Sequence, residues 1–231
     1  MSKKSLIALI VAAVLPVTCY FLLKYFSNEA VVMPRRYFPD TVITKTEFGK
    51  TTTDTIWHQV RNFTLTNQLG KKVQLSDLDG KIIIADFFFT SCPSICPTLT
   101  HNMKKLQDAF NKTDTIVRFI SFTIDPKRDS ATRLKAYSDK YGVNPDTWWL
   151  LTGDKEELYD IAKNEFKANI ADTKIDTNFI HTQYFFMLDK NRVLRGWYDG
   201  LDSIHLNKLA DDIVLLMMEK DKSRKSGLFN R

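Results

Sequence analysis

The feature that most limits the fold of this chain is an apolar run, residues 82–89, that holds one charged residue, Asp86. A strand with one face in water alternates apolar and polar residues, whereas a strand covered on both faces is apolar at consecutive positions. The run therefore predicts a central strand in a sheet that is covered on both sides.

Strand and helix patterns alternate around this run. Helical spacing follows at 98–110, and a second strand pattern follows at 116–124. The other predicted elements are a hairpin at 63–75, a helix from Asp129, a short strand at 149–151, a helix at 156–166, a hairpin at 184–188 and 192–197, and a closing helix at 206–218. This order predicts a three-layer α/β domain with a mixed β-sheet.

The composition excludes several other classes of protein. Of the 231 residues, 44% are hydrophobic and 26% are charged, which is typical of one globular domain with a short appendage. Basic residues are scattered among acidic ones, whereas binding of nucleic acid needs them clustered, so no nucleic-acid partner is expected. Three cysteines are too few for a disulfide scaffold, so any cysteine chemistry must be local.

The N-terminal residues 1–27 are predicted to be a membrane anchor. Lys3 and Lys4 precede an apolar run at 6–23 that would be about 27 Å long as a helix, close to the thickness of a bilayer core. Bulky residues at 20–21 stand where a cleaved signal peptide would need small ones. Cys19 follows a poor lipidation signal, so we interpret it as a residue buried in the membrane.

The rest of the chain divides into three further parts. Residues 28–55 carry prolines and threonines without clear periodicity and are predicted to be a tether, residues 56–220 the folded domain, and residues 221–231 a flexible tail. No Arg-rich, Ser-rich presequence precedes the apolar run, which favours a bacterial envelope over a mitochondrion. We expect a single-pass protein of the bacterial cytoplasmic (inner) membrane, with its domain facing the periplasm or the outside.

Two cysteines follow the predicted central strand, in the segment Cys-Pro-Ser-Ile-Cys-Pro at 92–97. Ligands of open α/β sheets bind beyond the carboxyl ends of the strands, and a helix N-terminus lowers the pKa of a thiol. If both residues were helical, their Cα atoms would be about 6 Å apart, so that Cys92 and Cys96 could form a disulfide or remain a dithiol. A buried structural pair is the less favoured interpretation, because a strand end, a helix start and two prolines coincide here.

Two functions remain open for this pair. A thioredoxin-type redox pair prefers two intervening residues and a proline before the opposite strand, but no proline follows Pro145. His181 precedes the predicted strand at 184–188 instead. Two thiolates and an imidazole suit copper, Cu(I) above all, while zinc would want a fourth ligand. A lone histidine in a loop is more often a solvated residue, so these patterns alone leave His181 open.

Four segments of the chain resemble the Sco/SenC family. These are residues 63–71, 86–97 and 123–130, and His181 ahead of an aromatic-rich strand. The family comprises membrane-anchored copper chaperones of cytochrome c oxidase assembly, and the resemblance covers roughly 57–218. It implies a thioredoxin-like fold and the copper ligands Cys92, Cys96 and His181. Many relatives carry an aspartate directly before the ligand histidine, whereas this chain has Ile180, so an outer partner of the imidazole is missing or comes from elsewhere.

The resemblance implies a metallochaperone rather than an enzyme. It would take copper from a donor and deliver it to the CuA-bearing subunit of a haem-copper (cytochrome c) oxidase, with a membrane-side thiol reductase keeping its cysteines reduced. The alternative is a thiol:disulfide reductase that uses Cys92 and Cys96 as its redox-active pair and keeps the subunit's ligand cysteines reduced. A redox-sensing module that binds copper without delivering it is a third possibility.

Other polar residues receive structural interpretations. Asp125 and Asp129 flank a strand-to-helix turn, where Asp129 or Ser130 would cap the helix and Asp125 would brace the turn. Met103 fits an apolar helix stripe and is expected in the core, as are most of the aromatic residues. Surface or capping roles are expected for the three other histidines, His58, His101 and His205.

Overall fold

The structure is a computed structural model that describes residues 3–27, 32–47, 50–111, 115–168 and 183–219. The chain divides into two compact units, Met1–Met33 and Pro34–Arg231. The first unit holds helix α1 (Lys3–Ser27), which is helical as predicted. Over the described residues, no helix combines the length and the apolarity needed to cross a membrane. The membrane span thus stays a prediction from the sequence.

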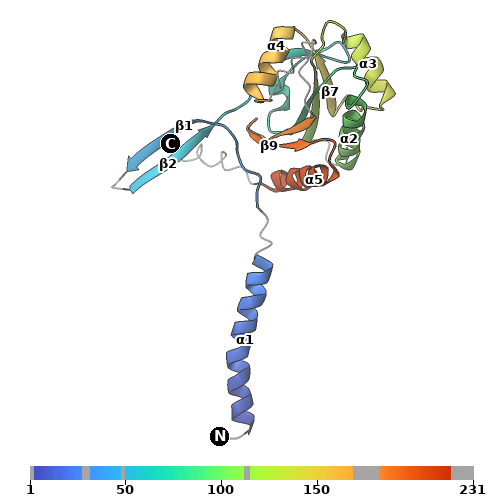
Figure 1. The fold of residues 1–231 in the computed structure, drawn as a ribbon. Helices are drawn as coiled ribbons and strands as arrows, with labels where there is room; N and C mark the ends of the chain where they lie inside the picture. The colour runs from blue at the N-terminus through green and yellow to red at the C-terminus, as the bar shows by residue number, and fades with distance from the viewer. Residues whose placement is uncertain (1–2, 28–31, 48–49, 112–114, 169–182, 220–231) are drawn as a thin grey trace. The chain divides into compact units, whose positions relative to one another are not determined.

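The second unit is built on a seven-stranded sheet in the order β4-β3-β7-β6-β5-β8-β9. Figure 1 shows helices on both sides of this sheet. Its central strands β5, β6 and β7 are parallel, and the outer pairings are antiparallel, so the predicted mixed sheet is confirmed. The strands are β3 (Thr64–Asn67), β4 (Lys72–Gln74), β5 (Ile82–Phe88), β6 (Val117–Thr123), β7 (Trp148–Thr152), β8 (Tyr184–Leu188) and β9 (Leu194–Asp199).

Helices cover both faces of this sheet. Helices α2 (Cys96–Ala109), α3 (Ala131–Lys140) and α5 (Ser203–Met218) pack on one face, and α4 (Lys155–Asp160) packs on the other. Successive side chains of β5 alternate between the two layers: Ile83 and Phe87 join the core under α4, while Ile84 and Phe88 join the core under α2. Every residue of β5 is buried, which confirms the prediction of a central, doubly covered strand.

Two local elements differ from their sequence patterns. The helix predicted at 156–166 ends as α4 at Asp160 and continues as a wider π-helical turn, Ile161–Glu165. A short 3-10 turn, Leu75–Leu78, follows β4. These changes leave the layers and the strand order as expected.

A two-stranded hairpin of β1 (Pro39–Glu47) and β2 (Lys50–Trp57) lies within the segment predicted to be a tether. Threonine occupies three consecutive positions of β2, residues 51–53, and β1 has two adjacent apolar residues, Val42 and Ile43, so the sequence carries no clear two-residue alternation. Backbone hydrogen bonds fix the root of the hairpin, from Tyr37 N to the carbonyl of Leu194 (3.0 Å) among others. The segment is therefore regular where the sequence pattern suggested an irregular connection.

Candidate thiol and metal site

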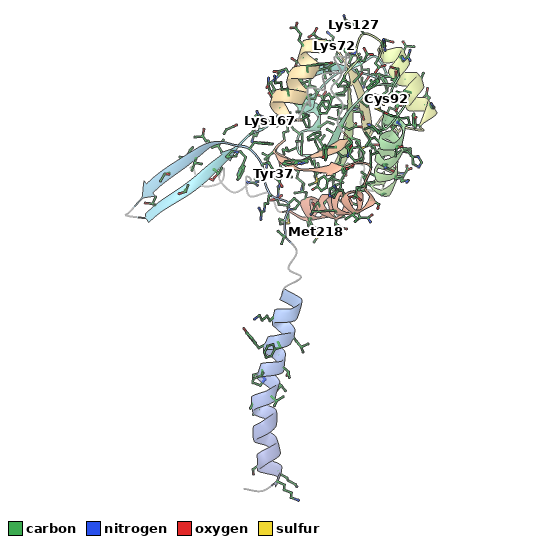
Figure 2. The ribbon with its side chains drawn as sticks, in the orientation of Figure 1. Tyr37, Lys72, Cys92, Lys127, Lys167 and Met218 are labelled. Atoms are coloured by element: carbon green, nitrogen blue, oxygen red, sulfur yellow. The ribbon has the colours of Figure 1, made fainter. Side chains whose placement is uncertain are left out.

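The two cysteines lie at the carboxyl end of β5, where the chain turns into α2. Figure 2 labels Cys92. Cys92 lies in the connecting loop, and Cys96 is the first residue of α2, followed by Pro97. Proline suits a first helical turn, since the N–H it lacks has no partner within the helix there. The premise that both cysteines have helical backbone is therefore wrong for Cys92. Both are nevertheless buried, with exposed fractions of 6% and 2%.

The structure brings these two predicted site residues together. The side chain of Cys96 makes a hydrogen bond with the side chain of Cys92, and the Ser94 hydroxyl oxygen lies 3.7 Å from the Cys92 sulfur. The third predicted residue, His181, lies outside the described residues. Among the described residues, no three His, Cys, Asp or Glu side chains are placed so that they could hold a metal ion. The arrangement seen is thus a buried dithiol.

Burial decides the protonation state of Cys96. The sequence predicted a lowered pKa at the helix N-terminus, but loss of solvation raises the pKa of Cys96 strongly, and its hydrogen bond with Cys92 raises it further. A backbone hydrogen bond with Phe89 acts in the opposite direction and is the smaller effect. Cys96 is therefore a neutral thiol at physiological pH, and a bound metal ion would have to displace its proton.

A buried carboxyl group, that of Asp86, lies on the central strand that leads to the cysteines. Asp86 of β5 is 2% exposed, and its burial raises its pKa to about 7, against the opposing effect of a hydrogen bond with Ser121. The Ser121 hydroxyl oxygen also accepts a hydrogen bond from the Trp148 indole N–H (2.9 Å). Within the described residues, Oδ1 of Asp86 has no hydrogen-bond partner. Sequence analysis used Asp86 only as part of a motif, although one acid in a doubly buried run is itself an unusual signal.

Asp129, which follows β6, has a different role from the helix cap expected for it. Ser130 alone caps α3, since its hydroxyl accepts a hydrogen bond from Arg133 N. Asp129 instead reaches the cysteine loop: its carboxylate accepts hydrogen bonds from Thr90 N (3.0 Å) and from the hydroxyls of Thr90 (2.5 Å) and Thr123 (2.6 Å). The prediction that Asp129 or Ser130 caps the helix is therefore correct only for Ser130.

The remaining candidates have structural surroundings. Asp125 braces the turn as predicted, since its N–H donates to the Thr123 hydroxyl and its carbonyl accepts from the N–H groups of Arg128 and Asp129. His58 lies 3.3 Å from Asp40 and 3.4 Å from Glu165; His205 accepts a hydrogen bond from Asp199 N; His101 is exposed on α2. Met103 is fully buried, as expected for the core.

The turn after β9 packs closely against α2. A β-carbon added to Gly200 would lie 2.5 Å from Leu99 Cδ2 and 2.9 Å from Phe185 Cζ, so only glycine fits without displacement. Gly200 N donates to the carbonyl of Gln183 (2.8 Å), and Asn102 of α2 donates to the carbonyl of Gly200. The residue that leads into β8 is therefore tied to the helix that carries Cys96.

Sequence comparisons point to one family. A family model described as SCO1/SenC matches residues 52–217. The chain is 32% identical over 166 residues to the SCO1 protein homolog of Bacillus subtilis (strain 168), which covers 71% of this chain and 86% of that protein. It is also 32% identical over 100 residues to a putative copper-binding protein of Stutzerimonas stutzeri, covering 43% of this chain and 48% of that protein.

Solved structures show the same fold. A SCO1/SenC family lipoprotein from Bacillus anthracis str. Ames matches with a TM-score of 0.63 at 33% identity, over 70% of this chain and 95% of that one. BsSco, reported with a disulfide switch and as a member of the Sco family of cytochrome c oxidase assembly proteins, matches with a TM-score of 0.62 at 31% identity, over 71% and 96%. These similarities confirm the predicted thioredoxin-like α/β fold.

Proposed function

Because the chain belongs to the SCO1/SenC family, we propose that it is a membrane-attached metallochaperone that binds one copper ion and delivers it to the CuA-bearing subunit of a haem-copper (cytochrome c) oxidase. Cys92, Cys96 and His181 would hold the ion. The observation that carries the proposal is the pair of buried, hydrogen-bonded thiols at the carboxyl end of the central strand. One relative is described as a putative copper-binding protein, and one similar structure as a cytochrome c oxidase assembly protein.

The donor chemistry fits this cargo. Thiolates are soft ligands that select Cu(I), and an imidazole suits copper as well. Cys96 lies in a water-poor position, so charge on its sulfur is tolerated only when a cation neutralises it. The same burial protects the thiols from solvent while the cargo is absent.

The topology supports a place for His181 in the ligand set. β8 runs antiparallel to β5, with Phe186 paired with Ala85. The first residue of β8 therefore lies near the carboxyl end of β5, where the cysteines are. His181 precedes Gln183 by two residues, and two residues of chain span about 7 Å at most. Gln183 is tied through Gly200 to α2. Covalent reach therefore supports convergence of the imidazole with the two sulfurs.

Loading and delivery follow from exchange of sulfur ligands. A copper donor would pass the ion to the dithiol as the bound thiols lose their protons. The acceptor's cysteines would then replace Cys92 and Cys96 one at a time, so that the ion is never free in solution. Oxidation of the pair to a disulfide would block loading, and a membrane-side thiol reductase would reverse it.

Substitution of His181 by alanine tests the copper assignment. Loss of a residue that only hydrogen-bonds to a metal ligand typically lowers metal affinity 10–100-fold. We expect His181→Ala, which removes a ligand itself, to lower copper affinity by at least this factor. Anaerobic titration of the reduced protein against a competing chelator measures this, and His101→Ala is the matched control because His101 is an exposed histidine on α2. Unchanged copper affinity in His181→Ala would remove this residue from the site.

A thiol:disulfide reductase is the second candidate, and the direct contact between the two thiols favours it. The Cys92–Cys96 dithiol would give two electrons and two protons to a disulfide of the oxidase subunit and become a disulfide itself. A similar structure is reported with a disulfide switch. The His181→Ala variant separates the two functions, since a reductase keeps its dithiol activity without the imidazole, while a chaperone loses copper binding and delivery together.

We further propose that α1 attaches the protein to the bacterial cytoplasmic membrane as a single span, with the domain on the periplasmic or outer side. The apolar run at 6–23 supports this, and a similar protein is described as a lipoprotein. The full chain should then stay with membranes after an alkaline wash, and Leu15→Lys should release most of it, because a central lysine costs about 3 kcal/mol in a span. Lys24→Gln is the control. Release of the unaltered chain would contradict attachment, and release by Cys19→Ser would indicate a lipid anchor instead of a span.

A further inference from the structure

The loop that carries the cysteines begins with a turn that contacts both of them. The carbonyl of Phe89 accepts a hydrogen bond from Cys92 N (3.2 Å), which closes the turn over residues 89–92. The backbone of Phe89 is also hydrogen-bonded to the thiol of Cys96. This turn therefore holds the backbone of Cys92 and also bonds to the thiol of Cys96.

Asp129 holds the centre of this turn from another segment. It follows β6, 39 residues after Thr90, and is fully buried. Oδ2 accepts from Thr90 N and from the Thr123 hydroxyl, and Oδ1 accepts from the Thr90 hydroxyl. Arg133 Nε donates to the same Thr90 hydroxyl (2.9 Å) and lies 3.9 Å from Asp129 Oδ1.

These contacts exceed what the turn after β6 requires. Ser130 caps α3, and the backbone bonds from Arg128 and Asp129 to the Asp125 carbonyl close the turn. The Thr123 bond serves the same segment as Asp129 itself. Of the three bonds that Asp129 accepts, the two from Thr90 cross to the cysteine loop, and a buried carboxylate costs free energy unless it is fully hydrogen-bonded.

We propose that Asp129 and Thr90 are positioning residues that hold the cysteine loop in its dithiol geometry and so resist disulfide formation. A disulfide requires the two sulfurs about 2.05 Å apart, much closer than two thiols that share a hydrogen bond. Cys96 begins α2 whereas Cys92 lies in the loop, so we assign the movement that closes the S–S bond to Cys92 and the turn before it. The Thr90–Asp129 bonds oppose that movement.

The redox step involved is simple. Each thiol of Cys92 and Cys96 loses one proton and one electron as the S–S bond forms. Oxidised glutathione takes both electrons and both protons and becomes two molecules of glutathione. Loss of one bond that favours the dithiol should therefore shift this equilibrium toward the protein disulfide.

A redox titration of the metal-free full chain against glutathione tests the proposal. Thr90→Val removes the hydroxyl, and with it the hydrogen bonds to Asp129 and from Arg133, but keeps the shape and the backbone N–H. We expect it to raise the equilibrium constant for disulfide formation roughly fivefold. For a two-electron couple, fivefold corresponds to about 20 mV. Asp129→Asn should shift it further in the same direction, because the amide keeps only one acceptor oxygen where the carboxylate has two for the three donors Thr90 N, the Thr90 hydroxyl and the Thr123 hydroxyl.

Two control variants separate positioning from general stability. Thr90→Ser keeps the hydroxyl and should stay within twofold of the unaltered protein. Thr123→Val removes the third bond to Asp129 without touching the cysteine loop, so it should lower the unfolding free energy yet leave the redox equilibrium within twofold. Equal constants for Thr90→Val and Thr90→Ser, or a shift in Thr123→Val as large as that in Thr90→Val, would overturn the proposal.

The inference rests on the proposed function only in that Cys92 and Cys96 are its reactive pair. Because no metal takes part in the titration, its outcome is independent of copper binding. A protein that binds no copper but shows the expected Thr90→Val shift would refute the chaperone and keep the positioning role. If Asp129→Asn does not fold, the Thr90 variants decide the question.

Discussion

Replacing Cys96 by serine is expected to abolish tight copper binding while the domain remains folded. Cys96 would supply a thiolate, and serine offers a hard hydroxyl that stays protonated and binds Cu(I) poorly. The loss of copper affinity should exceed the 10–100-fold that is typical when a residue hydrogen-bonded to a metal ligand is removed. Cys92→Ser should have the same effect, since each residue supplies one of two equivalent sulfurs. Anaerobic titration with Cu(I) and a competing chelator measures the affinity, and circular dichroism tests the fold.

The chain provides a matched control for these variants. Cys19 is the third cysteine and lies on α1, in the other compact unit, so Cys19→Ser should leave copper affinity unchanged. Stoichiometric copper with unaltered affinity in either Cys92→Ser or Cys96→Ser would refute the assignment. In that case the buried pair would have a structural or purely redox role.

Asp86→Asn is expected to stabilise the folded domain in mildly alkaline solution. The raised pKa of about 7, against an ordinary value of 3.8, means that the folded protein retains a proton on Asp86 in a range where the unfolded chain has lost it. The unfolding free energy from this group is therefore highest below pH 4 and falls as the pH rises toward 7. Asparagine resembles the protonated acid and does not titrate. The variant should gain on the order of 4 kcal/mol over the unaltered protein by pH 8, and little at pH 4.

Denaturant unfolding at several pH values between 4 and 8 measures this difference. Asp139→Asn is a suitable control, since Asp139 is an exposed partner of Lys135 on α3 and its loss should give a small offset that varies little with pH. The expected result is a gap between Asp86→Asn and the unaltered protein that widens with pH. A gap that stays constant from pH 5 to 8 would show that Asp86 is ionised in the folded state.

Most of the fold could be predicted because burial and sequence period agree. The apolar run at 82–89 had one solution, a central strand, and β5 is buried at every position. The hairpin of β1 and β2 could not be found this way, since threonine on both faces removes the alternation that marks a strand. The π-helical turn after α4 left no sequence signal that we recognise.

The pairing of the two cysteines was predictable from the sequence, while the energetics of the pair were predictable to a smaller extent. Spacing and position pointed to Cys92 and Cys96, and the structure places them in contact. The direction of the thiol pKa was predicted wrongly, because a helix terminus acts locally whereas burial depends on how α2 packs on the sheet. The hydrogen bonds between Thr90 and Asp129 join segments 39 residues apart. A single sequence does not show which residues that far apart will come into contact.

The absence of space around Gly200 has a consequence for how the site tolerates variation. Leu99 and Phe185 would both lie within 3 Å of a β-carbon at Gly200, so the turn leaves the smallest possible spacing between α2 and the start of β8. Even a methyl group at this position would displace the ends of both side chains and press on the carbonyl oxygen of Gln183, 3.0 Å away. If His181 joins the two sulfurs as proposed, the spacing between its segment and α2 depends on a residue that has no ligand atom in its own side chain.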